Sequence, residues 1–204
     1  MLIWIFKARA FFYTALLLLP LSVFAQYDFS FPSDSDFVSY NTQLLGFRNS
    51  NQTKENDFEL RIWFSNGIAE PSIAYLFDLT NRKGKWMGYF YSFMWKGNGD
   101  YITKSRKIKN ANLDSLFIFM YNNHLLTIPS QNVVITRLYM VGKQKISIAD
   151  GDDYRFELFT PLNKRWYRYH CPKIYSYNYD DSEYQDVVKI LNRIMKIVGF
   201  GGPC

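Results

Sequence analysis

The chain has 204 residues, a formal net charge of +6 and only two cysteines, Cys171 and Cys204. This length suffices for one domain with a hydrophobic core, or for two small halves that share one. The charge is mildly basic, which in an intracellular protein would indicate nucleic acid as a partner. The export signal at the start of the chain removes that expectation, so we expect no nucleic-acid partner.

The first 25 residues have the pattern of a secretory signal peptide. Lys7 and Arg9 precede an uncharged apolar run, which ends with small residues at the positions that a signal peptidase reads, Val23 and Ala25. The run covers 15 residues, whereas a membrane-spanning helix needs roughly 20. We therefore predict cleavage after Ala25, no stable membrane span after processing, and a periplasmic or secreted protein. An uncleaved anchor, which would also use the apolar residues before Lys7, is the alternative.

Residues 26–57 are rich in Ser, Asp, Asn and Gln and predict an irregular N-terminal arm, with one short helix near residues 37–45. From Phe58 onward, apolar residues alternate with polar ones, which indicates a half-buried strand. Turn residues separate this strand from three more apolar segments. The predicted strands are residues 58–64, 72–79, 85–95 and 100–108.

Two helices are predicted where the spacing of apolar residues changes. Asn112 can cap a helix over residues 113–124. Ser182 and Gln185 form a capping-box pattern at the start of a second helix, which Gly199 ends. Four more apolar segments between these helices are predicted as strands, at residues 133–140, 144–150, 154–160 and 164–171.

Together these elements predict an α+β fold, in which helices pack on one face of a largely antiparallel sheet. Residues 58–204 would then form a single α+β domain after the arm. The order of the elements also allows two ββββα halves, residues 58–129 and 130–204, although the halves share no repeated sequence.

Residues 85–95, KWMGYFYSFMW, include six aromatic residues. On a strand both faces of this segment would be apolar, which is typical of a strand that is covered on both sides. Aromatic rows also stack on sugar rings and are favoured at interfaces. We predict the core role, with Trp86, Phe90, Tyr91 and Phe93 substantially buried.

The candidate ligand-binding residues are Trp166, Arg168 and His170. They alternate along a predicted strand and would share one of its faces. Such a face can hold an anionic or sugar ligand through cation–π contacts and charge-assisted hydrogen bonds. The alternative is a solvated sheet face on which the aliphatic stem of the arginine covers a ring.

Evidence for an enzyme is weak. The sequence contains no HExxH, GxSxG, P-loop or CxxC motif. Its two histidines are His124 and His170, and the side chains of His170 and Cys171 would diverge on a strand, so they cannot form a nucleophile–base pair. The DGDD segment at residues 150–153 lacks the spacing of an EF-hand loop and predicts a turn. We predict no catalytic residue, no metal and no cofactor.

These features favour an exported, non-enzymatic binding or interaction module of the cell envelope, with an envelope glycan or protein as its partner. The alternative is an envelope hydrolase whose active site assembles from residues that are distant in the sequence. The two hypotheses predict different structures. A hydrolase should have a deep cleft that contains a histidine beside a carboxylate and a hydroxyl, whereas a binding module should have a shallow aromatic face.

Two segments carry a loose family resemblance. They are WFSNGIAEPSIAYLFDLTNRKGKWMGYFYSF, at residues 63–93, and YRFELFTPLNKRWYRYHCPKIY, at residues 154–175. With the terminal helix, this pattern resembles uncharacterised exported proteins of the Bacteroidetes. The resemblance implies a Gram-negative envelope location and implies no activity and no site residue.

Cys171 and Cys204 are predicted not to pair with each other. The predicted terminal helix is about 25 Å long, and the tail that follows it spans at most roughly 20 Å. Disulfide geometry requires the two Cα atoms to lie within about 7 Å. Cys204 is therefore predicted to be a free or intermolecular thiol.

Overall fold

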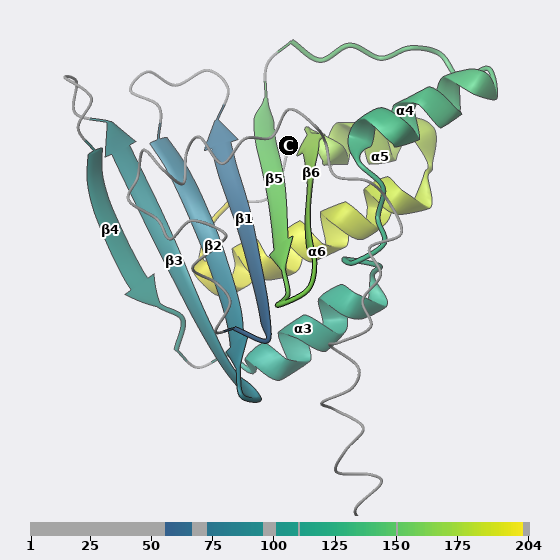
Figure 1. Cartoon of the computed structure of the whole chain (residues 1–204). Helices are drawn as coiled ribbons and strands as arrows, with labels where there is room; N and C mark the ends of the chain where they lie inside the picture. The colour runs from purple at the N-terminus through teal and green to yellow at the C-terminus, as the bar shows by residue number, and fades with distance from the viewer. Residues whose placement is uncertain (1–55, 67–72, 96–100, 110, 150, 202–204) are drawn as a thin grey trace, which may run out of the picture.

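The computed structural model describes residues 56–66, 73–95, 101–109, 111–149 and 151–201. These residues form one six-stranded sheet in which every neighbouring pair of strands is antiparallel. The order across the sheet is β4-β3-β2-β1-β5-β6, so β1 is a central strand (Figure 1). The strands are β1 (Phe58–Asn66), β2 (Ile73–Arg82), β3 (Lys85–Trp95), β4 (Tyr101–Lys107), β5 (Asp152–Phe159) and β6 (Lys164–His170).

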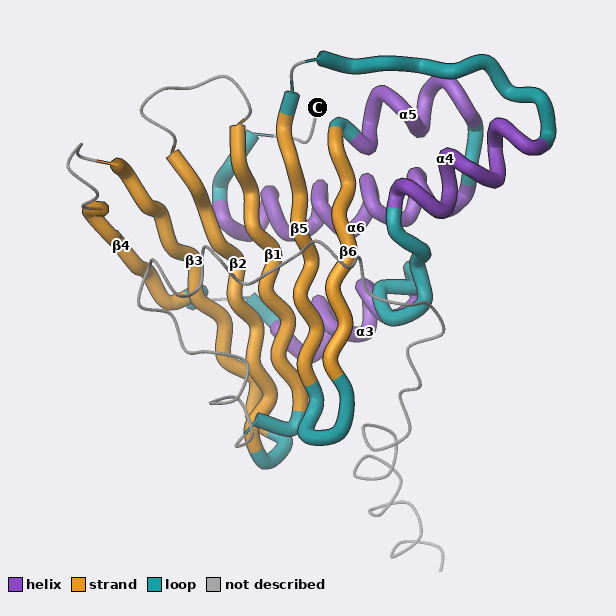
Figure 2. Tube along the Cα trace, turned by 45° about the horizontal axis from the view of Figure 1, so that its top comes forward, coloured by secondary structure: helices purple, strands orange, loops and turns teal. Residues whose placement is uncertain are grey.

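The described helices bury their apolar residues against one face of this sheet (Figure 2). They are α3 (Leu113–Asn122), α4 (Gln131–Met140), α5 (Pro172–Tyr179) and α6 (Ser182–Val198). The longest, α6, runs behind the strands in the view of Figure 1. The α+β fold with helices on one face is thereby confirmed. Among these helices, none is long and apolar enough to cross a membrane.

The alternation along β1 gives the sheet two different faces. Phe58, Leu60 and Ile62 belong to the core that the helices complete. Glu59, Arg61 and Trp63 point to the opposite side, which none of the described helices covers and which we call the helix-free face. The strand register places the following residues beside them on that face: Leu76, Asp78, Thr80, Tyr89, Tyr91, Phe93, Asp153, Arg155, Glu157, Lys164, Trp166, Arg168 and His170.

The aromatic segment on β3 is confirmed as core in part. Phe93 is fully buried and Phe90 is 8% exposed, whereas Trp86 and Tyr91 are only partly buried. Gly88 permits close packing on this strand, because a Cβ atom built there would lie 3.2 Å from the Cδ1 atom of Ile108. The segment therefore contributes side chains to both faces of the sheet.

The predicted helix ends are confirmed for α3 and corrected for α6. The Asn112 side chain caps α3 by accepting a hydrogen bond from the Ser115 N–H. At α6 the capping residue is Asp181, whose carboxylate accepts from the Glu183 N–H, so the cap lies one residue before the predicted Ser182. Gly199 ends α6 in the left-handed conformation, as predicted.

The prediction of a strand at residues 133–140 is wrong, because these residues belong to α4. Their β-branched residues favour a strand locally, but the buried Val134 and Leu138 are four residues apart, which is helical spacing. Residues 143–149 have no regular secondary structure. Since α5 was also not predicted, the second part of the chain runs α-β-β-α-α, and no second ββββα unit forms.

The prediction that the cysteines do not pair is also wrong. Cys171 is disulfide-bonded, and the only other cysteine of the chain, Cys204, lies outside the described residues. The reason is α5, which carries the chain outward over about 12 Å before α6 returns along it for about 25 Å. The outward and return paths partly cancel, which leaves a distance that a short tail can span.

Candidate functional site

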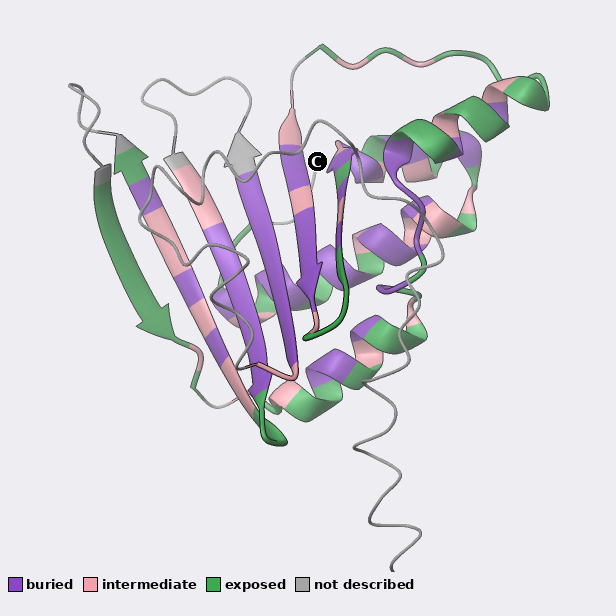
Figure 3. Ribbon diagram, in the orientation of Figure 1, coloured by how far each residue is buried: buried purple, intermediate pink, exposed green. Residues whose placement is uncertain are grey.

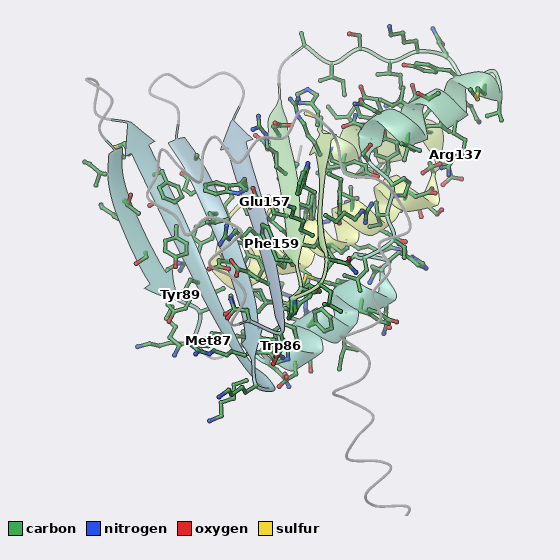
Figure 4. The ribbon with its side chains drawn as sticks, viewed as in Figure 1. Trp86, Met87, Tyr89, Arg137, Glu157 and Phe159 are labelled. Atoms are coloured by element: carbon green, nitrogen blue, oxygen red, sulfur yellow. The ribbon has the colours of Figure 1, made fainter. Side chains whose placement is uncertain are left out.

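The register places charged and aromatic side chains in line across the helix-free face. Arg61 on β1 lies opposite Asp78 on β2 and Glu157 on β5. Across the sheet, Tyr89 on β3 lies opposite Asp78, and Trp166 on β6 lies opposite Glu157. One row of side chains therefore crosses five strands, and Figure 4 labels two of its members, Tyr89 and Glu157.

Arg61 and Glu157 at the centre of this row are buried, and so is Glu59, which precedes Arg61 on the same face of β1. Arg61, Glu59 and Glu157 are 2%, 3% and 3% exposed. The Arg61 Nη2 atom lies 2.5 Å from Glu59 Oε1, and its Nη1 atom lies 3.8 Å from Glu157 Oε2. The Arg61 guanidinium thus pairs with two carboxylates. Because its contact with Glu157 is the longer one, the negative charge of Glu157 is less well compensated than that of Glu59.

Burial changes the acid–base behaviour of this row. It raises the pKa of Glu157 from 4.5 to about 7, against the smaller opposing effects of the Arg61 charge and the Trp63 side chain. Burial, followed by the charge of Asp78, raises the pKa of Tyr91 to about 12. Glu157 can therefore hold a proton near neutral pH, which reduces the excess of negative charge in the row.

A second group of charges lies beside this row, on the outer strands β5 and β6. The buried Asp153 carboxylate accepts from Arg155 Nε at 3.1 Å and from Arg168 Nε at 2.5 Å. Arg155 and Arg168 are opposite each other in the register. Because one carboxylate joins two guanidinium groups, this trio retains one positive charge.

The structure places all three candidate residues, Trp166, Arg168 and His170, on the helix-free face of the edge strand β6; we call them the β6 patch. The Arg168 side chain is 56% exposed, while Trp166 and His170 are partly buried. The Lys164 ammonium lies 5.6 Å from the centroid of the Trp166 ring. At His170 the backbone N–H donates to Gln131 Oε1, which joins the end of β6 to α4.

The opposite side of β6 is structural. Arg165 is fully buried, and it donates to the backbone carbonyls of Leu126 and Ile128. The Tyr167 and Tyr169 hydroxyls donate to the carbonyls of Leu125 and Pro129. These bonds fix the segment between α3 and α4 and hold β6, and with it the β6 patch, against the core.

Reasoning from the sequence missed the residues that support the β6 patch. Asp153 was interpreted as part of a turn, although it is the shared partner of two arginines. Arg155 and Lys164 were not selected, because their proximity depends on which residues of β5 and β6 lie opposite each other. The buried row was missed because Glu59 and Arg61 alternate with apolar residues, which is typical of an exposed face.

The arrangement expected of a hydrolase is not found around either histidine in the described part of the chain. His124 Nδ1 lies 2.7 Å from Asp186 Oδ2, with its side chain 68% exposed. Among the described residues, neither this ring nor the His170 ring has a hydrogen bond to a hydroxyl or a thiol. Among the residues that the structure describes, no three or more His, Cys, Asp or Glu side chains come close enough together to hold a metal ion.

Comparison with known proteins adds no family to this description. Neither a scan against protein-family models nor a search of curated proteins found a match to the chain.

Proposed function

We propose that the protein is an exported binding module of the cell envelope and that the β6 patch holds an anionic glycan. The observation that carries this proposal is the geometry of Arg168. Its Nε atom is bonded to the buried Asp153, while the side chain remains 56% exposed. The guanidinium is therefore oriented before a ligand arrives, and its terminal Nη groups remain for an acceptor.

The neighbours of Arg168 favour a sugar acid over a simple anion. Trp166 lies two residues away on the same face, and an indole ring is a side chain of the kind on which sugars stack. The guanidinium forms paired hydrogen bonds with carboxylate or sulfate groups. A ligand that carries both a ring and an acidic group would use both residues together.

Charge supports the same ligand class. Lys164, Arg155 and Arg168 lie near Trp166 on this face, and the buried Asp153 carboxylate pairs with both arginines. The positive potential of such a group attracts an anionic ligand. The signal peptide predicted at residues 1–25 would deliver the chain to a compartment in which acidic glycans are available.

The alternative of an envelope hydrolase finds its best residue in Glu157, whose pKa of about 7 suits a general acid. Its side chain is 3% exposed, however, so a substrate atom cannot contact it in this conformation. A catalytic acid must reach the proton acceptor directly or through one water. Binding at the exposed patch is therefore the better supported function.

The experiment is an array of uronate, sulfated and neutral oligosaccharides, probed with the mature chain and with a variant that carries Trp166→Ala, Arg168→Ala and His170→Ala. We expect the unmodified chain to bind acidic oligosaccharides in preference to neutral ones, and the triple variant to lose this binding with an unchanged circular dichroism spectrum. Undiminished binding by the folded triple variant would remove the patch from consideration.

A further inference from the structure

The C-terminal end of α4 carries exposed apolar side chains. Met140 is 81% exposed and Val141 is 69% exposed, and no large hydrophobic side chain of the described residues is more exposed than Met140. Figures 1 and 2 show this end of α4 projecting beyond the sheet and beyond α5. Figure 3 shows exposed residues there and along the segment that follows. We call residues 140–145 the α4 tip.

The backbone of the α4 tip is fixed by a helix-ending motif. Gly142 takes the left-handed conformation with a φ of 79°, and its N–H donates to the Tyr139 carbonyl at 3.0 Å. The Lys143 N–H donates to the Leu138 carbonyl at 3.0 Å, which completes a Schellman motif. Leu138 belongs to the core, so the motif ties the tip to the body of the protein. The two exposed apolar side chains therefore lie on an ordered turn.

Hydrogen bonds from α5 hold the segment after this turn. The Tyr179 hydroxyl donates to the Gln144 carbonyl at 2.8 Å and accepts from the Ile146 N–H at 3.1 Å. Tyr179 is itself buried in the core. The segment is thus anchored through its main chain, while the side chains of Lys143 and Lys145 stay exposed.

The α4 tip has positive charge without acidic neighbours in the sequence. Residues 115–149 contain no Asp or Glu. Neither Lys143 nor Lys145 pairs with a carboxylate of the described residues. Arg137, labelled in Figure 4, differs because its guanidinium is bonded to two carboxylates at the start of α6. The two lysines therefore present positive charge beside the two apolar side chains.

We infer that the α4 tip docks on the surface of a lipid bilayer that contains anionic lipids. Met140 and Val141 enter the boundary between the headgroups and the acyl chains, where burial of apolar side chains is favourable. Lys143 and Lys145 lie at the level of the lipid phosphates, because an anionic surface attracts lysine side chains. Tyr139 directly precedes the apolar pair, and tyrosine is favoured at membrane–water interfaces.

The shape of the α4 tip favours a bilayer over a protein partner. A specific protein–protein interface buries about 800 Å² on each partner. A projecting turn of six residues offers a smaller and convex surface, whereas a bilayer is soft and admits a few apolar side chains on their own. The export predicted from residues 1–25 would bring the chain to such a membrane.

This surface is separate from the β6 patch. The α4 helix begins beside His170, whose backbone N–H donates to Gln131, and Met140 follows nine residues later, about 14 Å along the helix. Attachment through the tip is peripheral and requires no helix that spans the membrane. The inference therefore does not rest on the proposed glycan.

The test is co-sedimentation of the mature chain with vesicles of phosphatidylcholine alone and of phosphatidylcholine mixed equally with phosphatidylglycerol. We expect binding to the anionic vesicles only, and binding that weakens as the salt concentration rises. M140S/V141S should lower the bound fraction at least about fivefold, and K143Q/K145Q should reduce it to the level seen with phosphatidylcholine. The matched controls are I118S/L162S and K104Q/K107Q, which change exposed residues on other surfaces and should leave binding unchanged.

Undiminished vesicle binding by M140S/V141S with an unchanged circular dichroism spectrum would overturn the inference, as would an absence of binding to both kinds of vesicle. Equal losses in K143Q/K145Q and K104Q/K107Q would also overturn it, because net charge alone would then attract the chain. This second comparison decides the matter if M140S/V141S does not fold. A dimer that M140S/V141S converts to a monomer, without vesicle binding, would assign the tip to a contact between copies. Vesicle binding of the expected kind without any binding on the glycan array would contradict the proposed function alone.

Discussion

The two faces of the same sheet differ in what holds their side chains in place. On the helix-covered face, rings pack against rings, as where Phe156 stacks on Tyr167 with their centroids 4.7 Å apart. On the helix-free face, the central strands carry Glu59, Arg61 and Glu157, whose burial is expensive and must be offset by pairing. The first face therefore stabilises the fold through apolar burial, whereas each buried charge on the second face depends on a partner.

Strand β6 shows the same difference within one element. Arg165 and Arg168 are three residues apart and lie on opposite faces. Arg165 is fully buried and bonded to backbone carbonyls, whereas Arg168 is held by one carboxylate and remains exposed. The residue type is identical, so the surroundings alone give one arginine a structural role and leave the other available to a ligand.

The largest effect is expected from Phe156→Ala on the helix-covered face. This fully buried ring should cost about 3–5 kcal/mol of the free energy of unfolding when it is removed, because a cavity remains. Urea unfolding measures this cost. Leu162→Ala, at a side chain that is 74% exposed, is the control and should change stability by less than about 0.5 kcal/mol. Equal costs at the two positions would contradict the assignment of the core.

The comparison within β6 comes next. Arg165→Ala should cost about 2–4 kcal/mol, because it leaves two buried carbonyls without donors. Arg168→Ala should cost less than about 1 kcal/mol, as is usual for an exposed ion pair. Thermal and urea unfolding of both variants would measure the difference, and a larger loss for Arg168→Ala would reverse the roles assigned to the two faces.

The third effect concerns pH and the buried row. The pKa of Glu157 is raised by burial, so the folded state binds the proton more tightly than the unfolded state. The contribution of Glu157 to the free energy of unfolding is therefore fully present below about pH 4.5, and it is lost as the pH rises toward about 7.

Glu157→Gln removes this titration. Between pH 4.5 and pH 8, the stability of the variant relative to the wild type should rise by on the order of 2 kcal/mol. Urea unfolding across this range measures it, with Glu183→Gln as the control, since the pKa of Glu183 is lowered to about 2 by Arg137. A pH-independent difference for Glu157→Gln would show that the row is solvated.

Local patterns predicted most of the fold. Local patterns placed β1, β2, β3 and β4 to within three residues of their observed ends, and the cap at Asn112 placed the start of α3. The failures were α4, where β-branched residues concealed a helical pair at Val134 and Leu138, and α5, which has no strong apolar stripe. In both segments the local preference was weak and packing against the core decided the outcome.

The candidate site was less predictable than the fold. The shared face of Trp166, Arg168 and His170 follows from alternation within one strand. Their support from Asp153 and Arg155 follows from the register between β5 and β6, which a single sequence does not encode at short range. The prediction that the two cysteines do not pair failed because the sequence analysis did not predict α5. The chain reverses direction after this helix.

The most direct test of the central claim is a titration of Arg168→Ala with the acidic oligosaccharide that binds the unmodified chain best on the array. Lys104→Ala is the matched control, because it removes the same charge from an exposed position on β4, at the other edge of the sheet. We expect Arg168→Ala to weaken binding at least about tenfold, as loss of a charge-assisted hydrogen bond does, and Lys104→Ala to change it by less than about twofold. Equal weakening by the two substitutions would show that net charge alone attracts the ligand and would contradict a site at Arg168.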